Sequence, residues 1–153
     1  MKIVEYSNCV EKDNYVRQID AYEWRAAKYL ATLLKENRLQ TTLGGWAKLY
    51  LLVDGNAIVS IVVLSAQDCI DDPNIMPWLG FFHTAPQYRG KRHGKKLIDY
   101  VCEVAREEGY KTIYLATDHV GLYEKYGFVY LENRIDVYGE NSRVYKRDIS
   151  IST

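Results

Sequence analysis

A basic, glycine-containing loop joins a predicted strand to a predicted helix, and it most constrains the fold of this chain. Residues 89–96 (RGKRHGKK) carry five Lys or Arg side chains and one His, and they follow the apolar run 78–84. A helical pattern over 94–108 comes next, and then the apolar run 112–116, which lacks polar alternation. A run of that kind is typical of a strand buried on both faces of a parallel sheet. The order strand, helix, buried strand predicts one right-handed βαβ crossover.

The same loop has the features of an anion site. Gly90 and Gly94 allow the backbone to turn tightly and to come close to a ligand. Positive side chains are unfavourable at the N-terminal end of a helix, which already carries partial positive charge. A bound anion reverses this effect, because free N–H groups at a helix N-terminus bind phosphate. We interpret the loop as a pyrophosphate cradle; the alternative is a solvated basic turn. A nucleotide-hydrolysing P-loop is disfavoured, because Lys96 replaces its hydroxyl residue.

The remaining pattern predicts an α/β fold in a single domain spanning residues 1–153. Apolar residues recur at helical spacing from about residue 13 to the Gly44-Gly45 pair, as one long helix or two with a bend. A Rossmann sheet is disfavoured, because strands and helices do not alternate regularly. We expect a mixed, mostly antiparallel sheet of six to seven strands with one parallel crossover and helices on both faces. Further strands are predicted at 3–6, 46–53, 57–64, 128–131 and 143–149, and Gly80 suggests a bulge within 78–84.

Composition and charge favour a protein that binds a small anion. The formal net charge is zero, and without the five basic side chains of the loop the rest of the chain carries −5. A positive field this local suits a small ligand better than nucleic acid or a membrane surface. The longest apolar stretch, 57–66, is too short to span a bilayer. Three cysteines without CxxC spacing indicate neither a disulfide framework nor a zinc site, so we expect a cytoplasmic protein without a metal.

Two motifs carry a resemblance to a known family. Residues 84–97 (TAPQYRGKRHGKKL) resemble the acetyl-CoA signature of the GNAT acyltransferase superfamily, and residues 121–128 (GLYEKYGF) resemble its second signature. The resemblance covers most of the chain beyond residue 40 and implies an N-acetyltransferase that uses acetyl-CoA as its co-substrate. Two positions depart from the family pattern: Arg92 stands where the family has a glycine, and Ala116 stands where many members have an Asn.

The resemblance also implies which residues bind the cofactor. In the family, two parallel strands separate at a bulge, and the pantetheine arm of the cofactor pairs with the exposed strand edge. Phe82 and Thr84 would then offer backbone groups to the pantetheine and to the thioester oxygen. The basic loop would hold the diphosphate through Arg89, Gly90, Lys91, Arg92, His93, Gly94 and Lys95.

Proton transfer needs an acid and a base. Tyr123 matches the family tyrosine that protonates the departing thiolate, and its reference pKa near 10 is only about 1.5 units above that of a thiol. Tyr126, three residues along, is the alternative. No unique base is predicted: His83 lies on a strand, where packing or a surface position is the more natural role. The other possibilities are Asp118, His119, His93 of the loop and a water molecule.

The acceptor is predicted only by class. Two acidic residues and three aromatic ones suggest an acidic, aromatic mouth for a cationic amine, which is a small molecule or a peptide. Attack on the thioester is expected to be direct, since Cys102 belongs to a buried helical stripe and Cys69 lies in a loop with no base nearby. The edges of the final hairpin offer a surface for a homodimer. The residues of the mouth are Asp71, Asp72, Trp78, Tyr22 and Trp24.

Two other functions share the basic loop. A non-catalytic acyl-CoA-binding sensor would bind the cofactor and acetylate no amine. A nucleic-acid-binding domain would use residues 89–96 as a basic patch, and its binding would depend on salt and ignore coenzyme A. The net negative charge of the rest of the chain disfavours the second.

Overall fold

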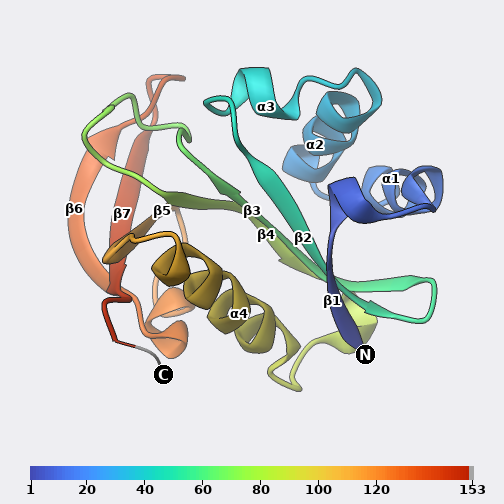
Figure 1. Ribbon diagram of the computed structural model, residues 1–153. Coiled ribbons are helices and arrows are strands. Elements are labelled where there is room, and N and C mark those ends of the chain that lie inside the picture. Colours follow the sequence, from blue (N-terminus) through green and yellow to red (C-terminus); the bar gives the residue numbers. More distant parts are fainter. Residues whose placement is uncertain (152–153) are drawn as a thin grey trace.

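The computed structural model describes residues 1–151, which form one seven-stranded sheet with helices on both faces (Figure 1). The strands are β1 (Lys2–Glu5), β2 (Lys48–Asp54), β3 (Ala57–Ser65), β4 (Trp78–Thr84), β5 (Thr112–Thr117), β6 (Val129–Ile135) and β7 (Asn141–Asp148). The α-helices are α1 (Lys12–Asp20), α2 (Arg25–Lys35), α3 (Leu39–Thr42) and α4 (His93–Glu107), and the 3-10 helices are η1 (Tyr6–Asn8), η2 (Pro86–Tyr88) and η3 (Tyr123–Tyr126).

The sheet has the predicted mixed topology. Its strand order is β1-β2-β3-β4-β5-β7-β6, and every neighbouring pair is antiparallel except β4 and β5. The fold class is therefore confirmed, with α4 as the crossover between the two parallel strands. The helical pattern after residue 13 divides into three helices rather than one or two, because the chain bends at 21–24 and again near Asn37, whose φ is +57°.

Each face of the sheet buries its own apolar core. On one face, α4 packs through Leu97 and Val101 against residues such as Leu52 of β2. On the other face, α1 and α2 pack against β2 and β3, with Ile19 and Leu30 fully buried (Figure 1). β3 is covered on both sides, which explains its continuous apolar sequence. Among residues 1–151, no helix is both long and apolar enough to cross a membrane.

A bulge interrupts β4 where it faces β3. Val63 pairs with Gly80 and Ile61 pairs with His83, so β4 contains one more residue than β3 between these two pairs. Phe81 has a φ of +54°, a value that is rare for a bulky side chain and marks it as the bulge residue. The predicted bulge is thus present, but at Phe81 rather than Gly80. Gly80 instead leaves room for the Asp68 side chain, because a Cβ at this position would lie 2.5 Å from Oδ2 of Asp68.

Candidate active site

The two parallel strands separate almost at once, which leaves a split in the sheet. β4 and β5 pair only at Trp78 and Tyr114, beside the bond that the Tyr114 N–H donates to the Pro77 carbonyl at 3.0 Å. Both strands continue past this point, to Thr84 and Thr117, without further pairing between them along the described chain. The edge of β4 that faces the split can therefore accept an extended ligand as an added strand.

The basic loop bends from the end of β4 into α4 in a fixed conformation. Arg89 Nε donates to the Thr84 carbonyl at 2.9 Å, which ties the loop to the last residue of β4. Gly90 has a φ of +84°, and Arg92, the residue before α4, has a φ of +63°. At the position where the family has a glycine, Arg92 thus adopts the left-handed conformation, at a cost of about 1 kcal/mol.

The first turn of α4 presents its N–H groups toward the loop. The first intrahelical bond of the turn runs from the Lys96 N–H to the Arg92 carbonyl at 3.2 Å, so the N–H groups of residues 93–95 precede it. The side chains of Arg89, Lys91 and Arg92 are exposed around this end. Lys95 is engaged elsewhere: its Nζ lies 2.6 Å from Oδ2 of Asp99, one turn along the helix. The local positive charge therefore comes mainly from the other basic residues of the loop.

Gly94 lets the first turn of α4 lie directly on β4. It is buried, and a Cβ added to it would lie 2.6 Å from Cζ of Phe82 and 3.0 Å from Oγ1 of Thr84. Any larger residue would separate the helix from the strand. The glycine thus brings the N-terminus of α4 next to the free edge of β4, so that one extended ligand can reach both.

Tyr123 lies on the same face of the sheet as α4. It is buried at the start of η3, and its ring contacts Phe82, Phe128 and Tyr145 with centroids 6.0–6.5 Å apart. Burial raises the pKa of Tyr123 well above its ordinary value, with smaller contributions from Tyr126 and from the charge of Asp68. Tyr126 also packs against Phe82, at 5.7 Å, and burial raises its pKa too. Both candidate tyrosines therefore face the split from one side.

Asp68 approaches the split from the opposite face. Leu79 points into the α4-side core, so Gly80, the next residue of β4, faces the other way, toward Asp68. Burial raises the pKa of the Asp68 carboxyl from 3.8 to about 6, although the Cys69 N–H donates to its Oδ1 at 2.6 Å. Sequence reasoning missed this residue, because one acid in a polar loop that also holds Asp71 and Asp72 gives no local signal of burial.

The four side chains considered as bases lie away from this point. His83 packs between Tyr22 and Trp24, with ring centroids 4.5 Å and 5.3 Å away, so packing is its role as expected. Burial, and then the charge of Arg89, lower the pKa of His83, and its Nε2 has no hydrogen-bond partner among residues 1–151. The others lie elsewhere: His93 contacts Tyr88 at the loop, and Asp118 and His119 are exposed beyond β5.

The cysteines are unsuited to nucleophilic catalysis. Cys102 is buried in the core, as predicted, and burial raises its pKa to about 12. Cys69 does have a carboxylate beside it, contrary to the expectation from sequence. Burial and the negative charges of Asp68 and Asp136 raise its pKa to about 12. A thiol with so high a pKa is almost fully protonated at neutral pH and is a weak nucleophile.

The predicted acceptor mouth is only partly present. Trp78 is fully buried and donates from Nε1 to the Ile75 carbonyl at 2.8 Å, so its place in the mouth was wrong. Asp72 forms an ion pair with Arg134 at 2.8 Å, which occupies its charge. Asp71 is exposed. Tyr22 and Trp24 pack on His83 rather than around an open site.

A different set of aromatic residues lies near Asp68. Tyr29 of α2 packs beside the bulge residue Phe81, with ring centroids 6.4 Å apart. Tyr138, in the turn between β6 and β7, is mostly exposed. The pKa of Tyr138 is raised, first by a small loss of solvation and then by the neighbouring Tyr29, Cys69 and Asp68. We call Tyr29, Phe81 and Tyr138 the aromatic rim.

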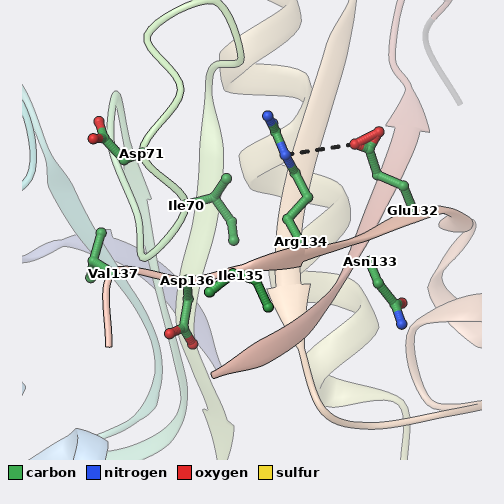
Figure 2. A pocket seen from close by; sticks show the side chains of 8 residues that line it. All are labelled: Ile70, Asp71, Glu132, Asn133, Arg134, Ile135, Asp136 and Val137. Atoms are coloured by element: carbon green, nitrogen blue, oxygen red, sulfur yellow. Dashed lines mark ion pairs between the residues drawn. The ribbon is translucent and has the colours of Figure 1, made fainter. Parts of the chain in front are cut away.

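A pocket of about 550 Å³ lies beside this region (Figure 2). It is lined by β6, the turn after it and the loop before β4, and Arg134 and Glu132, both on β6, pair at 3.7 Å on one side of it. None of the lining residues belongs to β4, α4 or η3, so the pocket includes neither the split nor the basic loop, although Val137 binds the loop that carries Asp68. Among the residues that the structure describes, no group of His, Cys, Asp and Glu side chains is arranged to hold a metal ion.

Comparison with known proteins assigns the family. The sequence profile described as "Acetyltransferase (GNAT) family" matches residues 11–128. This chain belongs to the GNAT acetyltransferase family. The match begins well before residue 40, so the GNAT pattern extends into the N-terminal helices, where the motifs alone gave only a coarse correspondence. As a GNAT member, the chain is an acyltransferase enzyme. No curated protein sequence matches it significantly.

Solved structures share the GNAT fold at low sequence identity. Aminoglycoside 6'-acetyltransferase type Ii is 20% identical over 100% of both chains, with a TM-score of 0.74. An aminoglycoside 6'-N-acetyltransferase complexed with coenzyme A is 16% identical over 100% of this chain and 99% of its own, with a TM-score of 0.71. A GNAT acetyltransferase from Staphylococcus aureus Mu50 is 23% identical over 97% of this chain and 99% of its own, with a TM-score of 0.65.

Proposed function

We propose that this chain is an N-acetyltransferase that moves an acetyl group from acetyl-CoA to a primary amine by direct attack in a ternary complex. The observation that carries the proposal is the split between β4 and β5. Residues approach this split from both faces of the sheet. Tyr123 and the first turn of α4 lie on one face, and Asp68 lies on the other. Two substrates can therefore meet at the split without sharing an entrance.

In this proposal, acetyl-CoA binds on the α4 face. The N–H groups before the first helical bond of α4 hold the diphosphate, with Arg89, Lys91 and Arg92 supplying charge. The pantetheine arm extends along the β4 edge past Phe82 and Thr84. A backbone N–H aimed at the thioester oxygen stabilises the tetrahedral intermediate, typically by about 3 kcal/mol. One structural relative of the same fold is complexed with coenzyme A, which supports the choice of cofactor.

The amine enters from the opposite face and attacks the thioester directly. Direct attack is favoured because Cys69, beside Asp68, and Cys102, in the core, both have a pKa raised to about 12. An acyl-enzyme intermediate on either of them would require a thiolate that is scarce at neutral pH. The acceptor is a small-molecule amine or a peptide, and Tyr123 protonates the departing thiolate.

The direct test is release of free thiol from acetyl-CoA in the presence of amines. A suitable panel contains spermidine, an aminoglycoside, a free amino acid and a peptide with an unblocked N-terminus. We expect amine-dependent thiol release for at least one of them, with the N-acetyl product identified by mass spectrometry. If calorimetry detects coenzyme A binding but all four amines remain unmodified, the chain is a binding module and the proposed transfer is wrong.

Substitution of Gly94 by Val is expected to weaken coenzyme A binding by about tenfold or more. The added side chain would collide with Phe82 and Thr84 and push the first turn of α4 away from β4. Calorimetric titration with coenzyme A measures the effect. Gly55→Ala is the matched control, because it strains a positive φ in the turn between β2 and β3, where no atom would contact the new Cβ. Equal affinities of the two variants for coenzyme A would show that Gly94 is not needed for cofactor binding.

We further propose that the enzyme is cytoplasmic, uses no metal and acts without a nucleic-acid or membrane partner, since its net charge is zero and the chain outside the basic loop carries a net charge of −5. A homodimer through β6 is also proposed. β6 is an edge strand, paired only with β7, and all but one of its residues are exposed. Light scattering of the purified protein tests this, and a monomer at micromolar concentration would contradict it.

A further inference from the structure

We infer that Asp68 is the general base of the reaction, and that its carboxylate takes the proton from the acceptor's ammonium group at the split between β4 and β5. The inference rests on the proposed function and adds a residue to it. The geometry is the first reason. Gly80 lies two residues after the β4–β5 pairing, and the Asp68 carboxylate packs against it so closely that a Cβ there would lie 2.5 Å from Oδ2.

The direction from which Asp68 approaches is the second reason. It lies on the face of the sheet that carries α2, opposite Tyr123 and α4. The charge of Asp68 nevertheless contributes to the raised pKa of Tyr123, after burial and Tyr126. A nitrogen that attacks the thioester from the α2 face would pass Asp68 immediately before it meets the carbonyl carbon.

Asp68 also differs from the other acids near it. Asp72 pairs with Arg134, and this contact lowers its pKa. Asp136 accepts bonds from the Tyr138 and Glu140 N–H groups at 2.9 Å, which fix the turn after β6. Asp68 has no cation among the groups that shift its pKa, and burial dominates. A pKa of about 6 keeps this carboxylate ionised at neutral pH and basic enough to accept a proton.

The loop that carries Asp68 is held in place by residues that are distant in the sequence. The Val137 N–H donates to the Cys69 carbonyl at 2.8 Å, and the Asp72–Arg134 pair joins the same loop to β6. The carboxylate is thus fixed between β4 and the aromatic rim. Its titratable neighbours are the Cys69 thiol beside it, Tyr138 and Asp136 of the β6–β7 turn, and Tyr123 across the split. An acceptor cation at this position is attracted by the carboxylates and by the faces of the rim aromatics.

The chemical step balances as follows. The ammonium R–NH₃⁺ gives one proton to Asp68, and the free lone pair of the nitrogen forms a bond to the thioester carbon. The carbonyl electron pair moves to oxygen and then returns, and the C–S bond breaks with its electrons on sulfur. The nitrogen loses a second proton and the thiolate gains one from Tyr123, so the products are an acetamide and coenzyme A thiol. One proton is released to solvent overall, from Asp68, while the second nitrogen proton restores Tyr123.

Protonation of Asp68 also favours the later steps. The negative charge of Asp68 is one of the influences that raise the pKa of Tyr123. When Asp68 accepts the ammonium proton, that charge disappears and Tyr123 becomes a stronger acid. The phenol is therefore better able to donate a proton after the acceptor has lost its own. This coupling favours an order in which the base acts first and the acid second.

The test compares Asp68→Asn with the wild-type enzyme, using acetyl-CoA and all four amines of the panel between pH 5 and pH 9. For wild type, we expect kcat/KM to fall below about pH 6 and to be level above it. For Asp68→Asn, we expect kcat/KM about 100-fold lower at pH 7 and rising about tenfold per pH unit, because the free amine must then form in solution. Coenzyme A affinity should stay unchanged. Asp54→Asn, an exposed acid at the end of β2, is the control.

Thermal stability provides a second readout that does not require turnover. Because burial raises the folded-state pKa of Asp68 from 3.8 to about 6, wild-type stability falls as the pH rises through this window. Asp68→Asn should therefore melt at a higher temperature than wild type at pH 7, and at nearly the same temperature at pH 4.

The possible outcomes separate this inference from the proposed function. If wild type transfers acetyl groups and Asp68→Asn does so with an unchanged pH profile, Asp68 is not the base and the proposed function stands. If wild type acetylates none of the amines, both are wrong. An equal melting temperature for the two proteins at pH 7 would show that the carboxylate is well solvated, which also contradicts the inference.

Discussion

Tyr123→Phe lowers kcat by about tenfold or more and leaves the dissociation constant of coenzyme A nearly unchanged. The substitution removes only the hydroxyl group, and a Phe ring keeps the contacts with Phe82, Phe128 and Tyr145. If the hydroxyl donates its proton only as the C–S bond breaks, its loss affects the transition state and not the binding of the ground state. Steady-state kinetics of thiol release and calorimetry with coenzyme A measure the two effects separately.

The raised pKa of Tyr123 limits the expected size of this effect. In water a phenol is about 1.5 pKa units weaker as an acid than a thiol, and burial widens that gap. Proton donation therefore depends on a thiolate that forms directly beside the hydroxyl. Tyr126→Phe is the matched control, because Tyr126 also contacts Phe82 but is only half-buried. A larger kcat loss for Tyr126→Phe than for Tyr123→Phe would assign the acid to Tyr126 instead.

The sequence predicted best those elements that are defined by local pattern. The bounds of β4 agree with the predicted run 78–84, because Pro77 and Pro86 delimit an apolar segment. The basic loop and α4 also agree to within one residue at each end, since glycine and helical periodicity act over short distances. The short helix that carries Tyr123 could be predicted because the motif 121–128 contains Gly127, whose φ of +86° closes η3.

The parts that could not be predicted depend on contacts between distant segments. Trp78 looked like a candidate for the acceptor mouth, but the loop 66–77 folds over it and buries it with Ile70 and Val144. That loop is held by residues more than sixty positions away, such as Arg134. The burial of Asp68 has the same origin. The bulge at Phe81 likewise follows from the register with β3 and not from the glycine beside it.

Asp99→Asn is expected to lower the free energy of unfolding by about 2–3 kcal/mol, because it removes the charge that pairs with a buried guanidinium. The Arg147 side chain is only 9% exposed, and its Nη1 lies 2.8 Å from Oδ1 of Asp99. Without the carboxylate charge, the buried guanidinium keeps only neutral acceptors among the described residues that bind it, the Asn amide oxygen and the Tyr126 carbonyl at 3.0 Å. Chemical denaturation followed by circular dichroism at pH 7 measures the loss.

Substitution of the other partner, Arg147→Met, should lower the free energy of unfolding by a smaller amount. Asp99 keeps a second partner, the ammonium group of Lys95 at 2.6 Å, and its side chain is 28% exposed, so neither desolvation nor an unpaired charge is severe. Met fills most of the volume that the Arg side chain occupies in the core, and we expect a loss of about 1 kcal/mol. The double variant should resemble Arg147→Met rather than the sum of both single variants, since it leaves no buried unpaired charge. Equal losses for the two single variants would mean that Lys95 does not hold Asp99 in solution.

Because Arg147 also binds the backbone of η3 at Tyr126, its loss should lower kcat as well, by loosening the segment that carries Tyr123.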